Sequence, residues 1–272
     1  MGRYKTARHD RRDRAKSQGL TKILAVVIAL LALVGLYLWT VSDRRALDPQ
    51  TLCPPGEESI TVLLVDVTDP LTLPQRQDFV NQLERLRTSI PRYGKLAIYK
   101  VDATSEQLLQ PVIERCNPGT AADVSEWTGN PQATENEWRE GFERPLDQAF
   151  LEITQASSAN RSPIIESVQS IALTELTSPQ AEGKPRQLII ASDLLQNTDR
   201  ISFYERLPAA EQLIASDAFR MLRTDLRDIE VELWMLQRPD SQQSQPRELI
   251  NLWELIIREQ GGDVTRVYNV SG

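Results

Sequence analysis

Residues 60–65 read ITVLLV, and Asp66 follows them directly. A short, continuous apolar run that is rich in β-branched residues and bounded by polar turns is typical of a strand buried on both faces. Residues 187–191 read QLIIA, have the same character, and end at Ser192 and Asp193. Two such strands predict a sheet that is covered by helices on both sides.

Similar strand-like segments occur elsewhere in the sequence. Further strands are expected at residues 95–101, 111–115, 230–236 and 264–270. Helical spacing of apolar residues separates most of them, as in residues 135–156 and 208–227. We therefore predict an α/β fold with a doubly wound, mostly parallel six-stranded sheet.

Two acidic residues follow the two most apolar strands. The carboxyl ends of parallel strands meet at one edge of a sheet, and ligands bind beyond that edge in doubly wound folds. We therefore expect Asp66 and Asp193 to lie at the same edge. Ser162 precedes Pro163 and has the sequence signature of a helix N-cap. Residues 238–248 are expected to form a polar loop.

Residues 23–41 contain nineteen residues without a charge, enough to span the roughly 30 Å hydrocarbon core of a bilayer. Ten Lys/Arg and three Asp/Glu lie in residues 1–45, and most of the basic residues precede the apolar run. The positive-inside rule then places the N-terminus in the cytoplasm of an inner (plasma) membrane and residues 46–272 on the periplasmic or extracellular side. A cleaved signal peptide is the alternative interpretation.

The predicted organisation has four parts. Residues 1–22 form a basic cytoplasmic leader, 23–41 a single-pass transmembrane helix, 42–57 a linker and 58–272 the folded domain. Cys53 and Cys116, the only cysteines, are both exported in this scheme. An oxidising compartment favours a disulfide between them, with two buried free thiols as the alternative.

Composition excludes several classes of function. Residues 46–272 carry 21 Lys/Arg and 35 Asp/Glu, so they lack the basic footprint of a nucleic-acid-binding protein. His9 is the only histidine and lies in the leader, which excludes His-dependent catalysis and His-ligated zinc in the domain. The sequence has no P-loop or dinucleotide motif, so no nucleotide is expected.

The order strand, DVTDP, helix, strand pair, long loop, helix, RSPIIES helix, strand, SDL resembles that of the von Willebrand factor A (vWA) domain, a Rossmann-like fold, over about residues 58–272. The family's metal-ion-dependent adhesion site reads D-x-S-x-S after the first strand, with a later Thr and Asp. Asp66 and Thr68 match its first two members, Ser162 falls where the Thr belongs, and Asp193 falls at the last Asp. The resemblance thus implies Mg²⁺ or another divalent cation on these four residues.

One member of that motif is replaced. Pro70 stands where the second Ser belongs and supplies no side-chain oxygen, and Asp69 could compensate only by turning into the site. The alternative is ordinary: Asp66 and Asp193 cap the helices or turns that follow them, and Ser162 caps a helix.

The resemblance implies a protein-interaction module, membrane-anchored and without enzymatic activity, that binds a protein partner at the edge containing Asp66, Asp69 and Asp193. Two alternatives stay open. The chain could be a structural component of an envelope complex that acts mainly through its transmembrane helix. Less favoured is a metal-dependent hydrolase that uses Asp66, because Thr68 stands where such chemistry usually places a second Asp.

Overall fold

The structure is a computed structural model that describes residues 22–38, 46–66, 71–101, 108–126, 129–154, 161–204, 206–238 and 247–270. The chain divides into two units, Met1–Ala46 and Leu47–Gly272. In the first unit, residues 22–38 are helical. No helix in the described ranges is both long and apolar enough to cross a membrane. Residues 39–41 of the predicted span lie outside those ranges.

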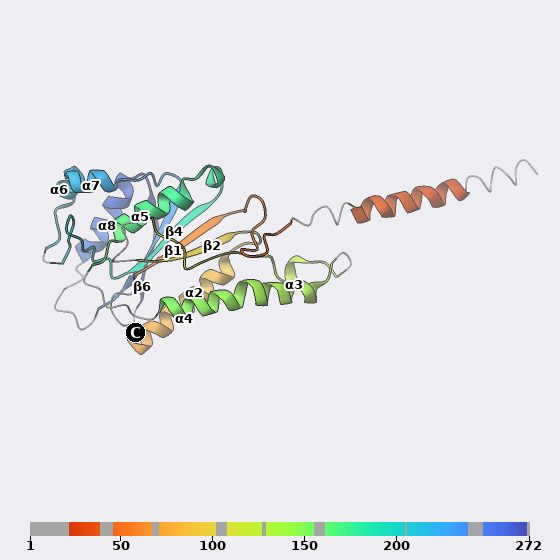
Figure 1. Cartoon of the computed structure of the whole chain (residues 1–272), viewed down its shortest axis with the longest axis horizontal. Helices are drawn as coiled ribbons and strands as arrows, with labels where there is room; N and C mark the ends of the chain where they lie inside the picture. Colours follow the sequence, from red (N-terminus) through yellow and green to blue (C-terminus); the bar gives the residue numbers. More distant parts are fainter. Residues whose placement is uncertain are drawn as a thin grey trace, which may run out of the picture. The chain divides into compact units, whose positions relative to one another are not determined.

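The second unit is built on one six-stranded sheet with the strand order β3-β2-β1-β4-β5-β6 (Figure 1). All neighbouring strands are parallel except β2 and β3. The mostly parallel, doubly wound α/β sheet predicted from the sequence is therefore confirmed. The strands are β1 (Ile60–Val65), β2 (Lys95–Lys100), β3 (Ile113–Cys116), β4 (Arg186–Ser192), β5 (Ile229–Leu236) and β6 (Asp263–Val270).

Helices cover both faces of this sheet (Figure 1). One core contains side chains of α2 and α4, and the other contains side chains of α5, α6, α7 and α8. Residues on β1 and β4 alternate between the two cores, as a strand buried on both faces requires. The helices are α2 (Leu73–Ser89), α3 (Pro131–Trp138), α4 (Arg144–Ile153), α5 (Ile164–Ile171), α6 (Ala210–Ala215), α7 (Asp217–Leu222) and α8 (Arg247–Glu259).

Short helical turns complete the described elements. The 3-10 turns are η1 (Ala121–Asp123) and η4 (Pro179–Ala181), and the π-helical turns are η2 (Arg139–Glu143) and η3 (Ala172–Leu176). The π turn η2 joins α3 to α4 directly before Pro145, where a kink is expected because proline has no amide hydrogen to continue the helix.

The single helix predicted over residues 208–227 is wrong. Ser216 lies between α6 and α7 in an extended conformation, and its hydroxyl oxygen accepts a hydrogen bond from the Phe219 amide at 3.1 Å. A serine that caps a new helix competes with continuation of the previous one, so the segment forms two helices of six residues each.

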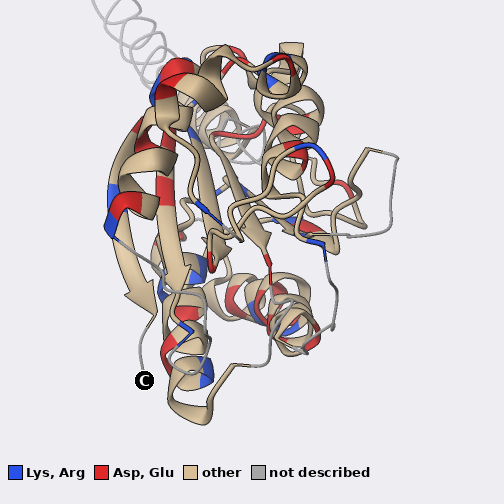
Figure 2. Ribbon diagram, turned by 90° about the vertical axis from the view of Figure 1, so that its left-hand side faces the viewer, with Lys and Arg blue, Asp and Glu red and all other residues tan. Residues whose placement is uncertain are grey.

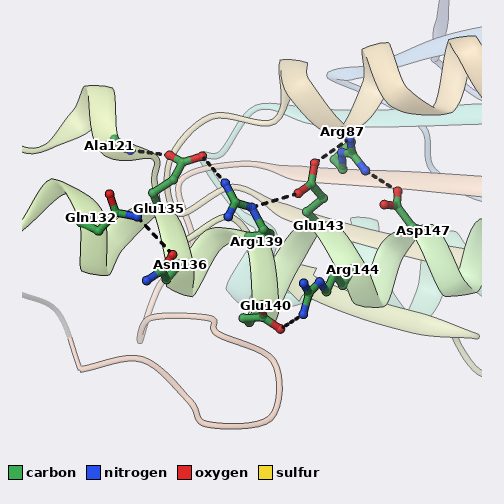
Figure 3. A network of polar contacts seen from close by, with 10 residues as sticks. All are labelled: Arg87, Ala121, Gln132, Glu135, Asn136, Arg139, Glu140, Glu143, Arg144 and Asp147. Atoms are coloured by element: carbon green, nitrogen blue, oxygen red, sulfur yellow. Dashed lines mark hydrogen bonds and ion pairs between the residues drawn. The ribbon is translucent and has the colours of Figure 1, made fainter.

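Ion pairs fix the α3, η2 and α4 segment to α2 (Figure 3). The guanidinium of Arg87 on α2 is largely buried, pairs with Glu143 at 3.2 Å and also pairs with Asp147. The same group lies 5.8 Å from the ring centroid of Trp138. Acidic and basic residues are interspersed along the helices (Figure 2).

A disulfide joins Cys53 to Cys116, the last residue of β3. This confirms the pairing predicted from the sequence. The Cys116 amide also donates to the Thr51 carbonyl at 2.8 Å. The bond and this contact attach the chain that precedes β1 to the edge of the sheet.

We predict that replacing both cysteines, Cys53→Ser with Cys116→Ser, lowers the free energy of unfolding. The bond closes a loop of 63 residues, and the loss of that constraint on the unfolded chain is worth about 4 kcal/mol. Urea unfolding of the oxidised protein, the reduced protein and the double variant measures the effect. Equal midpoints for the three would contradict the prediction, and two alkylatable thiols in unreduced protein would show that the bond does not form.

Candidate functional site

The register of β1 and β4 brings the two predicted carboxylates to one edge of the sheet. Val65 pairs with Ala191, and the Asp66 amide donates to the Ala191 carbonyl at 2.8 Å. Asp66 is therefore level with Ser192, and Asp193 follows one residue further along β4. In the order of this sheet, β1 and β4 are the two strands at which the direction of winding reverses, where doubly wound folds bind ligands.

The alternation of side chains along the strands explains which groups meet there. Leu64 and Ile190 face the core that contains α5, so Asp66 and Ser192, two positions later, face the same side. Ser162 lies just before α5. Its hydroxyl donates to Oδ2 of Asp66 at 2.6 Å, and the Ser192 hydroxyl lies 3.1 Å from the same oxygen.

Ser192 connects the two carboxylates. Its oxygen is 3.1 Å from Asp66 Oδ2 and 3.3 Å from Asp193 Oδ1, and it accepts from the Leu194 amide at 2.9 Å. Because a hydroxyl has one hydrogen, it donates to one carboxylate at a time. Asp66 and Asp193 are each only 3% exposed, so both negative charges are held in a largely dehydrated edge.

Within the described ranges, two carboxylate oxygens of this group have no hydrogen bond, and one of them, Oδ2 of Asp193, is engaged by the ion pair with Arg238. Oδ1 of Asp66 is buried and has no hydrogen-bond partner among the described residues. Glu175 shows the contrast, because its two oxygens accept from Lys95 and Tyr99. Burial raises the pKa of Tyr99, and so does the nearby Glu175 carboxylate, which accepts the hydrogen bond of the Tyr99 hydroxyl. A buried carboxylate oxygen without a donor is costly and is a place where a cation, a water or a donor group would be stabilised.

The predicted N-cap role of Ser162 is wrong. The helix begins at Ile164 with Pro163 as its N-cap residue, and the Ser162 hydroxyl instead donates to Asp66. Gln196 takes that role instead: its side-chain oxygen accepts from the Ile165 amide at 2.9 Å, and its amide group donates to Glu166 at 2.8 Å. Gln196 is fully buried, so the chain after β4 is fixed to the start of α5.

Further bonds hold the segment 193–204. Ser162 and Asn197 exchange two backbone hydrogen bonds of 2.9 Å. Trp253 on α8 donates to the Leu194 carbonyl at 2.8 Å, and Leu194 has a left-handed φ of 63°. An unfavourable backbone conformation at a buried leucine persists only where its surroundings fix it. The edge is therefore a rigid arrangement.

Arg238 supplies a positive charge to this edge. It follows β5, the neighbour of β4, and its Nη2 forms an ion pair with Oδ2 of Asp193. Its Nη1 lies 3.4 Å from the Tyr204 hydroxyl. The Arg238 side chain is 15% exposed, against 4% for that of Asp193. Asp193 also accepts from the Leu195 amide at 2.9 Å, a local turn bond of the kind that the capping interpretation predicts.

The sequence predicted some of the polar side chains that meet at the carboxyl edge of β1 and β4. It selected Asp66, Ser162 and Asp193, which lie together, whereas Thr68 and Asp69 lie outside the described residues. It missed Ser192 and Arg238. The position of Ser192 between a buried strand and an aspartate, and that of Arg238 two residues after β5, are signals that could have placed both at this edge.

The cation site that the resemblance implies stays a prediction, because Thr68, one of its four residues, lies outside the described residues. Within the described ranges, no group of three His, Cys, Asp or Glu side chains could hold a metal ion. Oδ2 of Asp193 is paired with Arg238, and Oδ1 accepts a backbone amide. A divalent cation would have to share Asp193 with a guanidinium of like sign.

No protein-family model matches the chain. Comparison with curated proteins gives no match either.

Solved structures give weak similarities. An aerotolerance-related membrane protein from Bacteroides fragilis, with multiple mutations to serine, aligns at 11% identity and a TM-score of 0.35 over 79% of this chain and 92% of that one. BatB from Bacteroides thetaiotaomicron aligns at 16% and 0.37 over 79% and 91%, and the VWA domain of SpRpn10 at 7% and 0.39 over 79% and 87%. Such values carry no argument about function. The strand order of the chain itself defines a doubly wound α/β domain.

We predict that Ser162→Ala lowers the free energy of unfolding by about 1–3 kcal/mol, because it removes a donor from a buried carboxylate. Ser89→Ala is the matched control: this exposed serine bonds only its own helix backbone, and a change within about 0.5 kcal/mol is expected. Urea unfolding compares the two variants. Equal small losses would show that the Ser162 contact does not support Asp66.

Proposed function

We propose that this chain is a membrane-anchored interaction module, without enzymatic activity, whose α/β domain binds a protein partner at the carboxyl edge of β1 and β4. One observation carries the proposal: two buried carboxylates from separate strands organise a charged, rigid edge at the point where the sheet reverses its winding. Such an edge can bind a partner without ordering loops first, which lowers the entropic cost of association.

The carboxylates act indirectly in this proposal. Asp66 and Asp193 are too buried to offer a partner much surface, so they position the groups around them. The exposed residues of the segment 193–204, which are Asp199, Arg200 and Ser202, are the described parts that a partner would contact. Asp69, the third acidic residue expected to meet the partner, lies outside the described residues.

We expect a photo-crosslinking residue at Ser202 to capture the partner. Ser202 is exposed and is paired with Asn197, which is itself paired with Ser162. The matched control position is Glu182, which is exposed and lies before the opposite, amino end of β4.

The edge is then tested by adding Asp193→Asn to the variant that carries the photo-crosslinking residue in place of Ser202. Weakening the pair with Arg238 should reduce the Ser202 adduct by about tenfold, equivalent to about 1.4 kcal/mol. Asp228→Asn, an exposed aspartate at the opposite end of the sheet, should leave the adduct unchanged. An adduct that survives Asp193→Asn but disappears when residues 23–41 are replaced by an unrelated apolar span would favour the structural-component alternative.

The membrane anchor rests on separate observations. Residues 23–41 are uncharged and follow a basic leader, which supports insertion with the N-terminus in the cytoplasm. The disulfide supports export of the domain, because such bonds persist in oxidising compartments. Together they favour a single-pass protein of the inner membrane with its domain on the periplasmic or extracellular side.

Two arginines in the apolar segment should abolish this anchoring. Leu30→Arg with Leu33→Arg adds about 5–7 kcal/mol to the cost of insertion. We expect the double variant to leave the membrane fraction and to have Cys53 and Cys116 reduced and alkylatable in intact cells. Leu30→Met with Leu33→Met is the control and should stay in membranes with the bond formed. Alkylatable thiols in the wild-type protein would argue against export.

A further inference from the structure

Arg238 is the charged group that the expected metal site does not include. It approaches the edge from β5, on the other side of β4 from Asp66. Its ion pair with Asp193 is largely buried on both sides. Because a buried carboxylate is costly without an opposite charge, this pair stabilises Asp193 at the edge.

The positive charge occupies a coordination position that a cation would need. A divalent cation binds several oxygens at once, and the described oxygens at this edge are those of Asp66, Asp193, Ser162 and Ser192. Arg238 engages Oδ2 of Asp193, and a cation bound to that carboxylate would lie close to the guanidinium. The repulsion is strong in a site from which water is largely excluded. Guanidinium and cation are therefore alternatives at this edge.

Removal of the arginine would leave a different donor set. Oδ2 of Asp193 would join Oδ1 of Asp66, which is buried and lacks a hydrogen-bond partner among the described residues. Without the guanidinium, these two carboxylate oxygens would lie at the same edge as the Ser162 hydroxyl, which already contacts Asp66. Carboxylate and hydroxyl oxygens are ligands that Mg²⁺ and Mn²⁺ accept.

We propose that Arg238 is a built-in substitute for a divalent cation: its guanidinium neutralises Asp193 and keeps the edge free of metal. It is a positioning residue, since it acts by fixing the charge and geometry of the edge. One consequence rests on the proposed function, namely that partner capture at this edge does not require a divalent cation.

The test measures thermal unfolding of the full-length chain in detergent, with and without Mn²⁺, and compares the two conditions within each variant. Wild type and Arg238→Lys, which keeps the positive charge, should show no rise in Tm. Arg238→Ala should gain a rise of about 5–10 °C at a Mn²⁺ concentration of 100 times Kd. Adding Asp193→Asn to Arg238→Ala should abolish the gain. Arg238→Gln carries the same expectation as Arg238→Ala and replaces it if the alanine variant fails to fold.

Two results would overturn the proposal. One is a rise in Tm for wild type as large as that of Arg238→Ala. The other is the absence of any gain in both neutral variants, since the guanidinium would then not be what excludes the cation. Neither measurement involves the partner, so failure of the docking proposal is seen separately, as loss of the Ser202 adduct. Where that adduct forms, EDTA should leave its yield unchanged.

Discussion

Asp66 places a negative charge at the end of β1 where almost no water can reach it, and the rest of the edge is arranged around that charge. Its Oδ2 is contacted by two hydroxyls, one from Ser162, two residues before α5, and one from Ser192 at the end of β4. Neither hydroxyl is near Asp66 in the sequence. Stabilising the carboxylate therefore requires β1, β4 and the start of α5 to be assembled together, which makes this contact a measure of whether the fold is complete.

The start of α5 depends on an acceptor from another segment. Because the N-cap residue of α5 is Pro163, whose side chain has no acceptor, the first amides of the helix need another acceptor, and Gln196 provides one for Ile165. Gln196 can do so because the chain after β4 turns back along the sheet edge, held by Asn197 and by Trp253. These contacts fix the path of a loop that lies between β4 and α6, the kind of rigid loop on which binding residues are commonly carried.

Sequence patterns predicted the sheet well because burial on both faces produces apolar runs that can be recognised one strand at a time. The alternation of strands and helices was enough to place Asp66 and Asp193 at one edge. Local patterns failed where a side chain had two competing partners. Ser162 has a cap signature but bonds a residue 96 positions away, and Ser216 interrupts a helix whose apolar periodicity continues through it. Arg238 belongs to the segment 238–248 that the sequence predicts as a polar loop. Its ion pair with Asp193, which follows a different strand, leaves no periodic pattern in the sequence.

The edge can be neutralised in two ways, by a metal ion taken up from solution or by the guanidinium of Arg238, which is part of the chain. A metal ion must first lose water, and its occupancy depends on its concentration and on several oxygens being arranged in advance. A guanidinium needs only one carboxylate in suitable geometry. Because it is attached to the chain, it is present at any metal concentration, and its cost is the entropy that the arginine side chain loses when it is ordered. Pro70 stands where the motif of the resembled family has a serine and supplies no side-chain oxygen, which matters more for a metal site than for an ion pair. Pro70 and Arg238 are therefore both consistent with the proposal that a guanidinium, and not a metal ion, neutralises Asp193.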